Sequence, residues 1–358
     1  MLKTDIAVIG AGPAGLNAAI SAASMGVKVL ILERDDFIGG QLIKQTHKFF
    51  GSREQHASVR GLDIANLLYE RVKEYKNIEL KLGATVLGYY EDGVITAEYQ
   101  GRFIKIKAEK YIVASGAAEK NLLFPNNDLP GIYGAGAVQT LTNVYGVLPG
   151  KRVLMVGSGN IGLIVSYQLL QAGVEIAGII EAAPKIGGYL VHAAKIRRAG
   201  VPIYTSHTIK EAYGESAVEG AVIWQLDDQW QSIAGTEQDI QADVICVAVG
   251  LAPLTELLWQ AGCTMKFVPQ LGGHVPVRDE NLRTTVDGVY VAGDVSGVEE
   301  ASAAMVEGKL AGLTAAYDLG YSNDKYAELC QEAKKQLAEL RSGPAGEKIR
   351  SGLKMLVG

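Results

Sequence analysis

Residues 6–15 read IAVIGAGPAG, an apolar run that ends in the spacing Gly10-x-Gly12-x-x-Gly15. A pattern of small residues typical of a helix follows from residue 13 to about residue 25. This order predicts a buried strand, a tight turn and a helix. Gly10 permits the turn, Gly12 lets backbone approach a pyrophosphate, and Gly15 lets helix and strand pack closely. The start of the helix offers free N–H groups and a positive dipole end to phosphates.

A second apolar run, over residues 28–32, ends in Glu33, which lies 18 positions after Gly15. A carboxylate at this place can accept hydrogen bonds from both hydroxyls of an adenosine ribose. The glycine spacing alone is weak evidence, because such a turn also serves helix packing without any nucleotide. Strand, glycines, helix, second strand and terminal acid together indicate a dinucleotide site.

A second unit of the same kind begins with a strand over residues 152–156. Its glycine turn reads GSGNIG at 157–162, its helix runs to about residue 172, and its next strand, 174–180, is closed by Glu181. From Gly10 to Gly157 the repeat distance is 147 residues, so the sequence predicts two dinucleotide sites. A carboxylate at 181 accepts from a 2′-hydroxyl and repels a 2′-phosphate, and the next cation is only Lys185, so this site favours NAD over NADP.

Composition bounds the class of protein. The chain has 358 residues, enough for about two domains, with 48% hydrophobic and 20% charged residues, as in ordinary soluble proteins. A net charge of −5 argues against nucleic acid or anionic membrane as a partner. No segment has about 18 uninterrupted apolar residues, so we expect a soluble, cytoplasmic protein without a membrane span. The 3 cysteines and 5 histidines lack metal-ligand and disulfide spacing, and Cys246, in an apolar run, is expected to be a buried, inert thiol.

The remaining pattern predicts further elements. Residues 42–57 are expected to be irregular and residues 121–130 to be a linker. Helices are predicted over residues 58–76, 189–199, 299–319 and 325–341, followed by a short tail that docks on its own domain or, alternatively, contacts a partner. Strands are predicted as an antiparallel meander over 78–82, 84–90, 93–99 and 102–108, and separately over 111–116, 201–204, 243–249 and 288–294. Residues 218–225 are expected to pair with 230–233.

With both glycine turns and the pair Gly293-Asp294 at a predicted strand end, the chain resembles the two-dinucleotide-binding-domain flavoproteins, whose members include thioredoxin reductase. The resemblance covers nearly all of residues 1–320. It implies an α/β fold of two Rossmann-like domains, each built from three layers in the order ββα. In this fold an NAD-binding domain is inserted into an FAD-binding domain. The implied ranges are 1–122 for the first part of the FAD domain, 123–252 for the NAD domain, 253–322 for the return segment of the FAD domain and 323–358 for a C-terminal helical tail.

The resemblance also implies which residues bind the cofactors FAD and NAD(H). On the FAD side they are Gly10, Gly12, Pro13, Ala14, Gly15, Glu33, Arg34, Gly40, Gln41, Thr46, His47, Val86, Ser115, Gly116, Gly293, Asp294, Ser302 and Ala303. On the NAD side they are Gly157, Gly159, Asn160, Ile161, Gly162, Glu181 and Gly250. Asp294 would bind the ribityl or pyrophosphate part, the loop from Gly40 to His47 would flank the isoalloxazine, and Ser302-Ala303 would lie at the pyrimidine. No catalytic acid or base is assigned, because hydride exchange between two rings needs geometry above all. Lys44 and His47 lie in the loop that is expected to flank the flavin. Two interpretations of these side chains stay open: they influence the flavin ring, or they are solvated at the surface.

Departures from the disulfide reductases of this family affect the chemistry. Thioredoxin reductase-like members carry Cys-x-x-Cys shortly before the second glycine turn, where this sequence reads TLTN at 140–143. The loop after Glu33 contains Gly39-Gly40-Gln41 where another branch has cysteines, and Ala301-Ser302 replaces an Arg-Gln pair. The fold and cofactors are therefore expected to carry over, and disulfide chemistry is not.

Within the family the chain looks most like the flavoprotein α-type subunits of sarcosine oxidase, opine oxidase, dye-linked proline dehydrogenase and hydrogen cyanide synthase. The stretches DLPGIYGAG at 128–136 and LPGKRV at 148–153 carry this resemblance. It implies an electron-transfer subunit in a hetero- or homo-oligomer. Its partner would be a second flavoprotein and/or an iron–sulfur subunit that holds a small amine or amino-acid substrate. Two alternatives stay open: a stand-alone NADH:acceptor reductase for quinone, ferredoxin or dye, and a structural subunit whose second site holds ADP, ATP or NAD without turnover.

Overall fold

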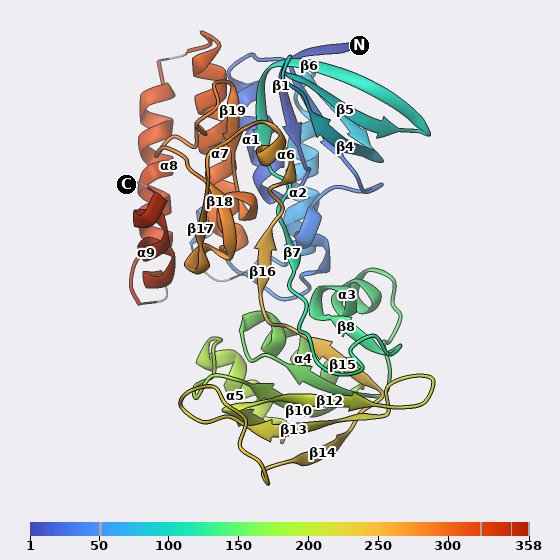
Figure 1. Cartoon of the computed structure of the whole chain (residues 1–358). Coiled ribbons are helices and arrows are strands. Elements are labelled where there is room, and N and C mark those ends of the chain that lie inside the picture. The colour runs from blue at the N-terminus through green and yellow to red at the C-terminus, as the bar shows by residue number, and fades with distance from the viewer. Residues whose placement is uncertain (50–51, 323, 345, 357–358) are drawn as a thin grey trace. The chain divides into compact units, whose positions relative to one another are not determined.

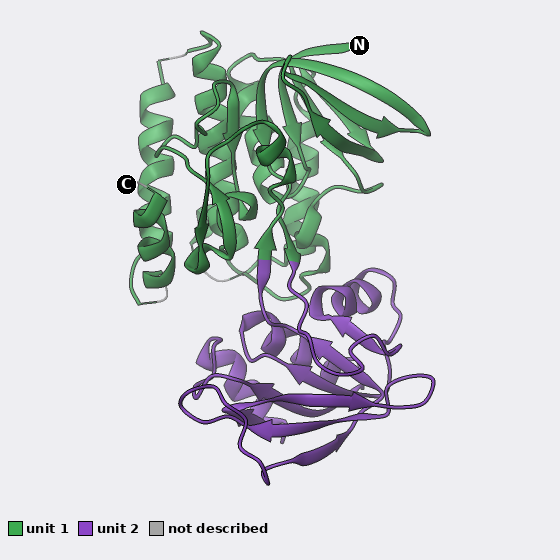
Figure 2. Ribbon diagram, viewed as in Figure 1, with its two compact units in different colours: residues 1–118, 252–358 green, residues 119–251 purple. Residues whose placement is uncertain are grey.

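The computed structural model describes residues 1–49, 52–322, 324–344 and 346–356 (Figure 1). Parts of the predicted irregular stretch (50–51) and of the predicted C-terminal tail (323, 345 and 357–358) lie outside the described residues. The chain forms two compact units, which we call unit 1 (residues 1–118 and 252–358) and unit 2 (residues 119–251) (Figure 2). The predicted domain ranges, with their assignment to FAD and NAD, stay a prediction.

Unit 1 is built on a parallel sheet in the order β3-β2-β1-β6, to which β19 adds by pairing with β6. Its strands are β1 Leu2–Ile9, β2 Val29–Glu33, β3 Ile78–Leu82, β6 Arg102–Val113 and β19 Val289–Val291. Successive strand residues point to opposite faces of the sheet. Ile6 and Val8 belong to one hydrophobic core and Ala7 and Ile9 to another, so both faces of this sheet are buried.

Helices cover one face of this sheet and strands cover the other. The first core is completed by α1 Pro13–Ser24, α2 Gly61–Lys73, α7 Ala301–Asp318 and α8 Tyr326–Leu340. The second core is completed by an antiparallel meander of β4 Ala84–Tyr89, β5 Val94–Tyr99 and the first half of β6. The unit therefore has the three layers that the sequence predicted.

Helix α7 lies directly against α1 because α7 presents glycine at the contact. A Cβ on Gly308 would overlap the carbonyl oxygen of Ala14, and one on Gly312 would overlap that of Ala18. Only glycine lets the two backbones approach this closely. Since Ala14 belongs to the first glycine turn, α7 covers that turn.

Unit 2 repeats the three-layer plan. Its parallel sheet has the order β11-β10-β9-β15-β8. The strands are β8 Ile132–Gly134, β9 Arg152–Val156, β10 Glu175–Glu181, β11 Ile203–Thr205 and β15 Val244–Val247. One face packs on α3 Ala135–Gln139, α4 Asn160–Gln171 and α5 Leu190–Arg198. The other face packs on the antiparallel strands β12 His207–Tyr213, β13 Gly220–Gln225 and β14 Gln238–Gln241.

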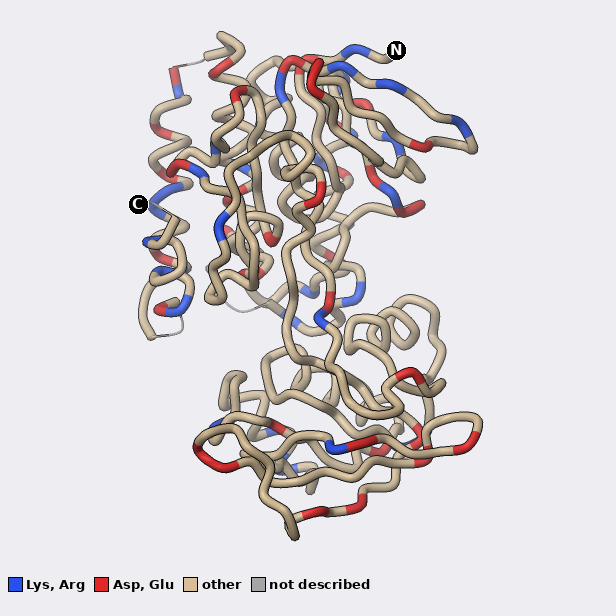
Figure 3. Tube along the Cα trace, in the orientation of Figure 1, with Lys and Arg blue, Asp and Glu red and all other residues tan. Residues whose placement is uncertain are grey.

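Short elements complete the chain. They are the 3-10 turns η1 Gly40–Lys44, η2 Arg53–Gln55, η4 Pro269–Leu271 and η5 Asp294–Ser296, the π-helical η3 Thr140–Val144, the helices α6 Glu256–Gln260 and α9 Glu347–Leu356, and the strand pairs β7 Ala117–Glu119 with β16 Leu251–Pro253 and β17 Met265–Val268 with β18 Gly273–Pro276. Leu356 of α9 is buried in a small core with Val268, Leu271 and Val275, so the final tail docks as a helix on its own unit, as predicted. Acidic and basic residues are interspersed along the trace of each unit (Figure 3). No helix in the described ranges is long and apolar enough to cross a membrane.

Two strand predictions in unit 1 need correction, one in its pairing and one in its bounds. The strand over 78–82 is not part of the antiparallel meander, because β3 pairs with β2 in parallel, with Ile78 opposite Val29. The predicted strand over 111–116 is the end of β6, which continues from residue 102 to 113 and pairs with β5 first and with β1 and β19 later. No glycine or proline interrupts residues 102–113, so the ladder continues without a break.

Two further expectations need correction. The predicted pairing of residues 218–225 with 230–233 is confirmed only at its end, where the backbone N of Ile233 donates to the carbonyl of Gln225 at 2.9 Å beside the bridge between Leu226 and Ser232. Along the rest of its length β13 pairs with β12 and β14 instead. Trp230 has a left-handed φ of 63°, which interrupts a regular strand there. The stretch 42–57 was expected to be irregular, yet within its described residues it contains the end of η1 and all of η2.

Candidate dinucleotide sites

The first glycine turn joins the carboxyl end of β1 to α1. Gly10 has φ +102°, and a Cβ there would overlap the carbonyl oxygen of Ala114. A Cβ on Gly15 would overlap the carbonyl oxygen of Gly10. Both glycines are therefore required by the close contact of strand, turn and helix. Gly12 differs, because its φ is −75° and the nearest atom to an added Cβ, Gly40 Cα, is 4.0 Å away.

The second glycine turn, between β9 and α4, has the same geometry. Gly157 has φ +108°, and its added Cβ would overlap the carbonyl oxygen of Ala248. An added Cβ on Gly162 would overlap the carbonyl oxygen of Gly157. Gly159 has φ −65°, and nothing lies within 4 Å of an added Cβ. Neither backbone conformation nor packing requires glycine at this position.

The middle glycines leave room beside each helix N-terminus. Gly12 and Gly159 are the N-caps of α1 and α4, and neither has a side chain that accepts a hydrogen bond from the helix. The first N–H groups of each helix therefore receive no side-chain cap from the N-cap residue, and the positive dipole end lies beside them. A methyl group at either glycine would occupy that space. The donor set and the absent side chain suit a pyrophosphate at each turn.

The acids at the ends of β2 and β10 are tied to the glycine turns. Glu33 accepts hydrogen bonds from the backbone N of Ala11 at 2.6 Å and of Asp35 at 3.0 Å. Glu181 accepts from the backbone N of Ser158 at 2.9 Å and of Ala183 at 3.0 Å. A carboxylate has about four acceptor sites, so Glu33, with two donors, keeps about two sites for ribose hydroxyls, and Glu181, which also accepts from the Ser158 hydroxyl, keeps about one.

Ser158 marks a difference between the two turns. Its hydroxyl donates to Glu181 Oε2 at 2.6 Å and accepts from the backbone N of Gly187 at 3.1 Å, whereas unit 1 has Ala11 at the corresponding position. The second acid is therefore held by one more donor than the first. The extra donor fixes the orientation of the Glu181 carboxylate, whose remaining lone pair can accept from a 2′-hydroxyl.

A second pair of glycines also belongs to each turn, and the sequence reasoning recognised only one pair. Gly39 donates its N–H to the carbonyl of Ala11 at 2.8 Å, and an added Cβ on Gly40 would lie 3.0 Å from Gly12 Cα. In unit 2, Gly188 donates to the carbonyl of Ser158 at 2.9 Å. The signal that identifies this pair is a repeat: Ile-Gly-Gly stands at 38–40 and again at 186–188.

Other predicted residues of the first turn and its loop have these positions. Pro13 and Ala14 form the first turn of α1, and Gln41 lies exposed in η1. Arg34 is exposed and pairs weakly with Asp35 at 3.9 Å. The loop after η1 contains Thr46 and His47, and the His47 ring stacks on Phe49 with 6.0 Å between ring centroids. Val86 lies in β4 and packs against the second core of unit 1, within the meander.

The ends of the neighbouring strands supply the next residues. Ser115 Oγ donates to the carbonyl of Leu254 at 2.8 Å, and Gly116 has φ +76°. In unit 2, Asn160 and Ile161 begin α4, and Asn160 Oδ1 accepts from the backbone N of Tyr189 at 2.8 Å. Gly250 has φ +116°, and its carbonyl accepts from the backbone N of Lys120.

Gly293 and Asp294 follow β19 and lie beside the first glycine turn. An added Cβ on Gly293 would lie 2.9 Å from the Cβ of Ala14. Asp294 Oδ1 accepts from the backbone N of Glu299 at 3.3 Å. Burial, together with the charges of Glu307 and Glu299, raises the pKa of Asp294 to about 7. Ser302 and Ala303 are buried in the first turn of α7.

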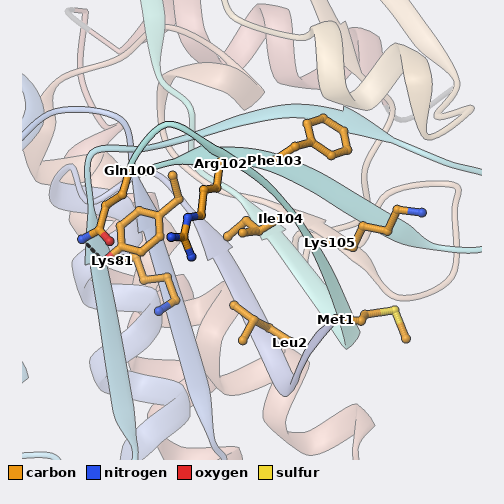
Figure 4. Close-up of a pocket in the computed structure, with 9 residues that line it drawn as sticks. Met1, Leu2, Lys81, Gln100, Arg102, Phe103, Ile104 and Lys105 are labelled. Atoms are coloured by element: carbon orange, nitrogen blue, oxygen red, sulfur yellow. Dashed lines mark hydrogen bonds between the residues drawn. The ribbon is translucent and has the colours of Figure 1, made fainter.

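An open hollow of about 540 Å³ lies elsewhere on unit 1 (Figure 4). It is lined by Met1, Leu2, Lys81, Tyr99, Gln100, Arg102, Phe103, Ile104 and Lys105. None of these belongs to a glycine turn or to the predicted cofactor residues, and most come from the hairpin between β5 and β6. We therefore expect nucleotides to bind not in this hollow but at the carboxyl ends of the parallel strands, where open α/β sheets bind their ligands.

The cysteines form no redox pair. Cys246, Cys263 and Cys330 are all buried and free. Burial raises the pKa of the Cys246 thiol well above its usual range and also raises that of Cys263. Cys246 is therefore the inert thiol that the sequence predicted.

Residues 4–308 match the family described as pyridine nucleotide-disulphide oxidoreductase. An opine oxidase subunit from Agrobacterium tumefaciens (strain Ach5) is 27% identical over 335 residues, which cover 88% of this chain and 66% of that relative. The chain thus spans slightly less than two thirds of the length of this relative.

Solved structures agree with the fold. The L-proline dehydrogenase of P. horikoshii superposes with a TM-score of 0.69 at 25% identity, covering 92% of this chain and 59% of that one. The thioredoxin reductase of T. acidophilum superposes with a TM-score of 0.73 at 25% identity, covering 89% and 99%. These similarities confirm the resemblance to two-domain flavoproteins and to α-type dehydrogenase subunits. The chain belongs to the pyridine nucleotide-disulphide oxidoreductase family.

Proposed function

We propose that this family member is an FAD-dependent, NAD(H)-binding subunit that passes electrons to or from a partner subunit. The observation that carries the proposal is the pair of equivalent glycine turns, each with an uncapped helix N-terminus, a glycine that packing does not require and a tethered acid. In this proposal residues 1–122 and 253–322 hold FAD, residues 123–252 hold NAD(H), and residues 323–358 form the helical tail.

The residues have distinct binding roles. At the first turn the N–H groups of α1 beside Gly12 hold the FAD diphosphate, and Glu33 accepts from the adenosine ribose. At the second turn the N–H groups of α4 beside Gly159 hold the NAD diphosphate, and Glu181 selects a free 2′-hydroxyl. When bound, the two cofactors supply hydride exchange between nicotinamide and flavin. The chain positions them and keeps water away, which requires no catalytic acid or base of its own.

The partner is inferred from the missing thiols. A disulfide relay needs two cysteines in contact, and the three buried, free cysteines offer none. Electrons therefore continue to a flavin or an iron–sulfur cluster on another polypeptide. L-proline dehydrogenase and opine oxidase are named for amino-acid-type substrates, and their similarity supports an amine or amino-acid substrate on that partner. A hetero- or homo-oligomer in the cytoplasm fits this role and the composition of the chain.

The test begins with the whole chain, purified from its host under conditions that keep bound partners attached. Added FAD is expected to stay bound through gel filtration, and anaerobic NADH is expected to bleach the flavin band near ~450 nm. Glu181→Gln should weaken NADH binding, whereas Glu175→Gln, an exposed carboxylate on the same strand, should not.

Each failure has a specific meaning. A folded chain that takes up no FAD contradicts the proposal. Bound FAD without bleaching by NADH favours a second site that holds a nucleotide without turnover. A companion-free chain that reduces quinone, ferredoxin or dye rapidly favours a stand-alone reductase.

A further inference from the structure

A buried ionic cluster lies beneath the loop that follows β19. Glu307 of α7 is 2% exposed, and its Oε1 pairs with Arg278 Nη2 at 2.8 Å and with Arg341 Nη2 at 2.6 Å. Arg341 also pairs with Glu299, through Nη2 at 2.6 Å and through Nε at 2.9 Å. These four side chains are all at least 88% buried. We call Arg278, Glu299, Glu307 and Arg341 the ionic cluster.

The ionic cluster holds the loop that carries Asp294. Glu307 Oε2 accepts from the backbone N of Gly293 and from the hydroxyl of Ser296, both at 2.9 Å. The backbone N of Glu299 donates to Asp294 Oδ1 at 3.3 Å. The loop is therefore held at Gly293 and Ser296 by the Glu307 carboxylate, and at Glu299 by the pairing of that side chain with Arg341.

The loop touches the first glycine turn directly. Gly293 lies against Ala14, and Gly308, one position after Glu307, lies against the Ala14 backbone. A shift of Glu307 would consequently move the residues that face the diphosphate site. Burial opposes ionisation of Glu307, but Arg278 and Arg341 outweigh it and lower the pKa of that carboxyl.

Arg341 comes from a part of the chain beyond the residues that match the family, 4–308. It follows α8, and its own carbonyl accepts from Arg350 Nη1 of α9. Arg350 Nη1 also donates to the carbonyl of Gly343 at 2.8 Å. The C-terminal helices α8 and α9 thus hold the backbone from which the Arg341 guanidinium reaches Glu299 and Glu307. A guanidinium presents five donors in a rigid planar fork and so holds two carboxylates in a fixed geometry, whereas an ammonium acts as a point charge on a flexible stem.

Charge balance explains why the guanidinium matters. The ionic cluster and Asp294 together contain three carboxyls and two guanidiniums. Removing Arg341 would take away the salt bridge of the buried Glu299 and leave Glu307 with Arg278 alone. Uncompensated buried charge forces rearrangement or protonation.

We propose that Arg341 is a positioning residue for the FAD site: by pairing with Glu299 and Glu307 it fixes the Gly293–Asp294 loop and neutralises charge beside the bound flavin nucleotide. The inference rests on the proposed function, because it takes FAD to occupy the first turn. It adds a role for the C-terminal segment that the two glycine turns do not imply.

The test compares Arg341→Met with Arg283→Met in the full chain. Arg283 is a matched control, because it also clamps α7 through a bidentate pair, to Asp318 at 2.7 and 2.8 Å, at the far end of that helix from Asp294. The FAD dissociation constant and the two-electron midpoint potential of the bound flavin are measured for both variants and the unchanged protein. Arg341→Met is expected to weaken FAD binding at least tenfold relative to Arg283→Met. It should also favour oxidised over reduced FAD by about tenfold, a fall in potential of about 30 mV.

Rescue distinguishes positioning from general support. Arg341→Lys keeps the charge but not the fork, so its FAD affinity and potential should lie between those of Arg341→Met and the unchanged protein. If Arg341→Met does not fold, Arg341→Lys is compared with Arg283→Lys in the same two measurements. Equal FAD affinity and equal potential in the Arg341 and Arg283 variants would overturn the inference. An unchanged protein that binds no FAD would instead overturn the proposed function.

Discussion

Gly159→Ala separates a nucleotide-binding role from a structural one. The residue has φ −65°, which alanine adopts freely, and an added methyl meets no atom within 4 Å. Gly162, three residues later, is its opposite, since a methyl there would overlap the carbonyl oxygen of Gly157. We therefore expect Gly159→Ala to fold normally and to lose NADH affinity, while Gly162→Ala loses stability.

The magnitudes follow from small opposing terms. Alanine is a poorer N-cap than glycine, so the substitution lowers the free energy of unfolding by up to ~1 kcal/mol. Alanine also restricts the unfolded chain, which stabilises by about 0.4–1 kcal/mol where the native backbone suits it. The two terms nearly cancel for Gly159→Ala. In the bound state the methyl enters space meant for a diphosphate, and overpacking costs about 1–3 kcal/mol. That cost corresponds to roughly 5–150-fold weaker binding.

The assay needs two measurements on each variant. Urea unfolding gives the free energy of unfolding, and calorimetric titration gives the NADH dissociation constant. FAD content serves as an internal control, because Gly159 belongs to unit 2 and the proposed flavin turn to unit 1. Gly12→Ala provides the reciprocal case, with FAD lost and stability kept, since its nearest neighbour to an added Cβ is 4.0 Å away. Undiminished NADH affinity in Gly159→Ala would refute the reasoning.

Two further predictions concern unit 1. Gly308→Ala and Gly312→Ala should each lower the free energy of unfolding by about 1–3 kcal/mol, because α7 must move away from α1 to make room for the methyl group. This loss is expected despite a gain in helix propensity of ~1 kcal/mol. Unchanged midpoints of urea unfolding would contradict the close contact of the two helices. Burial, Glu307 and Glu299 raise the pKa of Asp294 from 3.8 to about 7, so the folded chain holds a proton that the unfolded chain releases, and stability is lost as pH rises through this window. Asp294→Asn removes this pH dependence, which amounts to at most about 1.4 kcal/mol per pH unit. Urea unfolding of flavin-free protein at pH 5 and 8 should therefore show that the variant becomes more stable relative to the unchanged protein as the pH rises. A difference in the free energy of unfolding that is the same at both pH values would contradict this prediction.

The glycine turns were the most predictable part of the molecule, because their constraints are local. Gly15 is dictated by its contact with Gly10, five positions away, Gly10 by its own φ of +102°, and the acids end the next strand in the sequence. Both three-layer units follow from the same logic, since apolar strands buried on two faces need a cover on each. The sequence therefore predicted two Rossmann-like units and the family they belong to.

Pairings between distant segments were predicted poorly. Alternating apolar and polar residues indicate a strand but do not identify the strand with which it pairs. For this reason β3 was assigned to the meander and β13 to a hairpin. The ionic cluster shows the same difficulty, because its members at positions 278, 299, 307 and 341 share no spacing motif. Only folding brings them together. The Ile-Gly-Gly repeat at 38–40 and 186–188, in contrast, was visible in the sequence and was missed.

The two turns differ in what covers them, and this difference bears on how each would hold its nucleotide. Ala14 is 5% exposed beneath Gly293 and Gly308, so α7 and the β19 loop close over the first turn. Ile161, at the corresponding position of the second turn, is 39% exposed. A covered turn must open locally before a ligand leaves, which slows release, whereas an open turn lets ligands exchange. Under the proposed function this asymmetry favours a resident FAD at the first turn and an exchanging dinucleotide at the second.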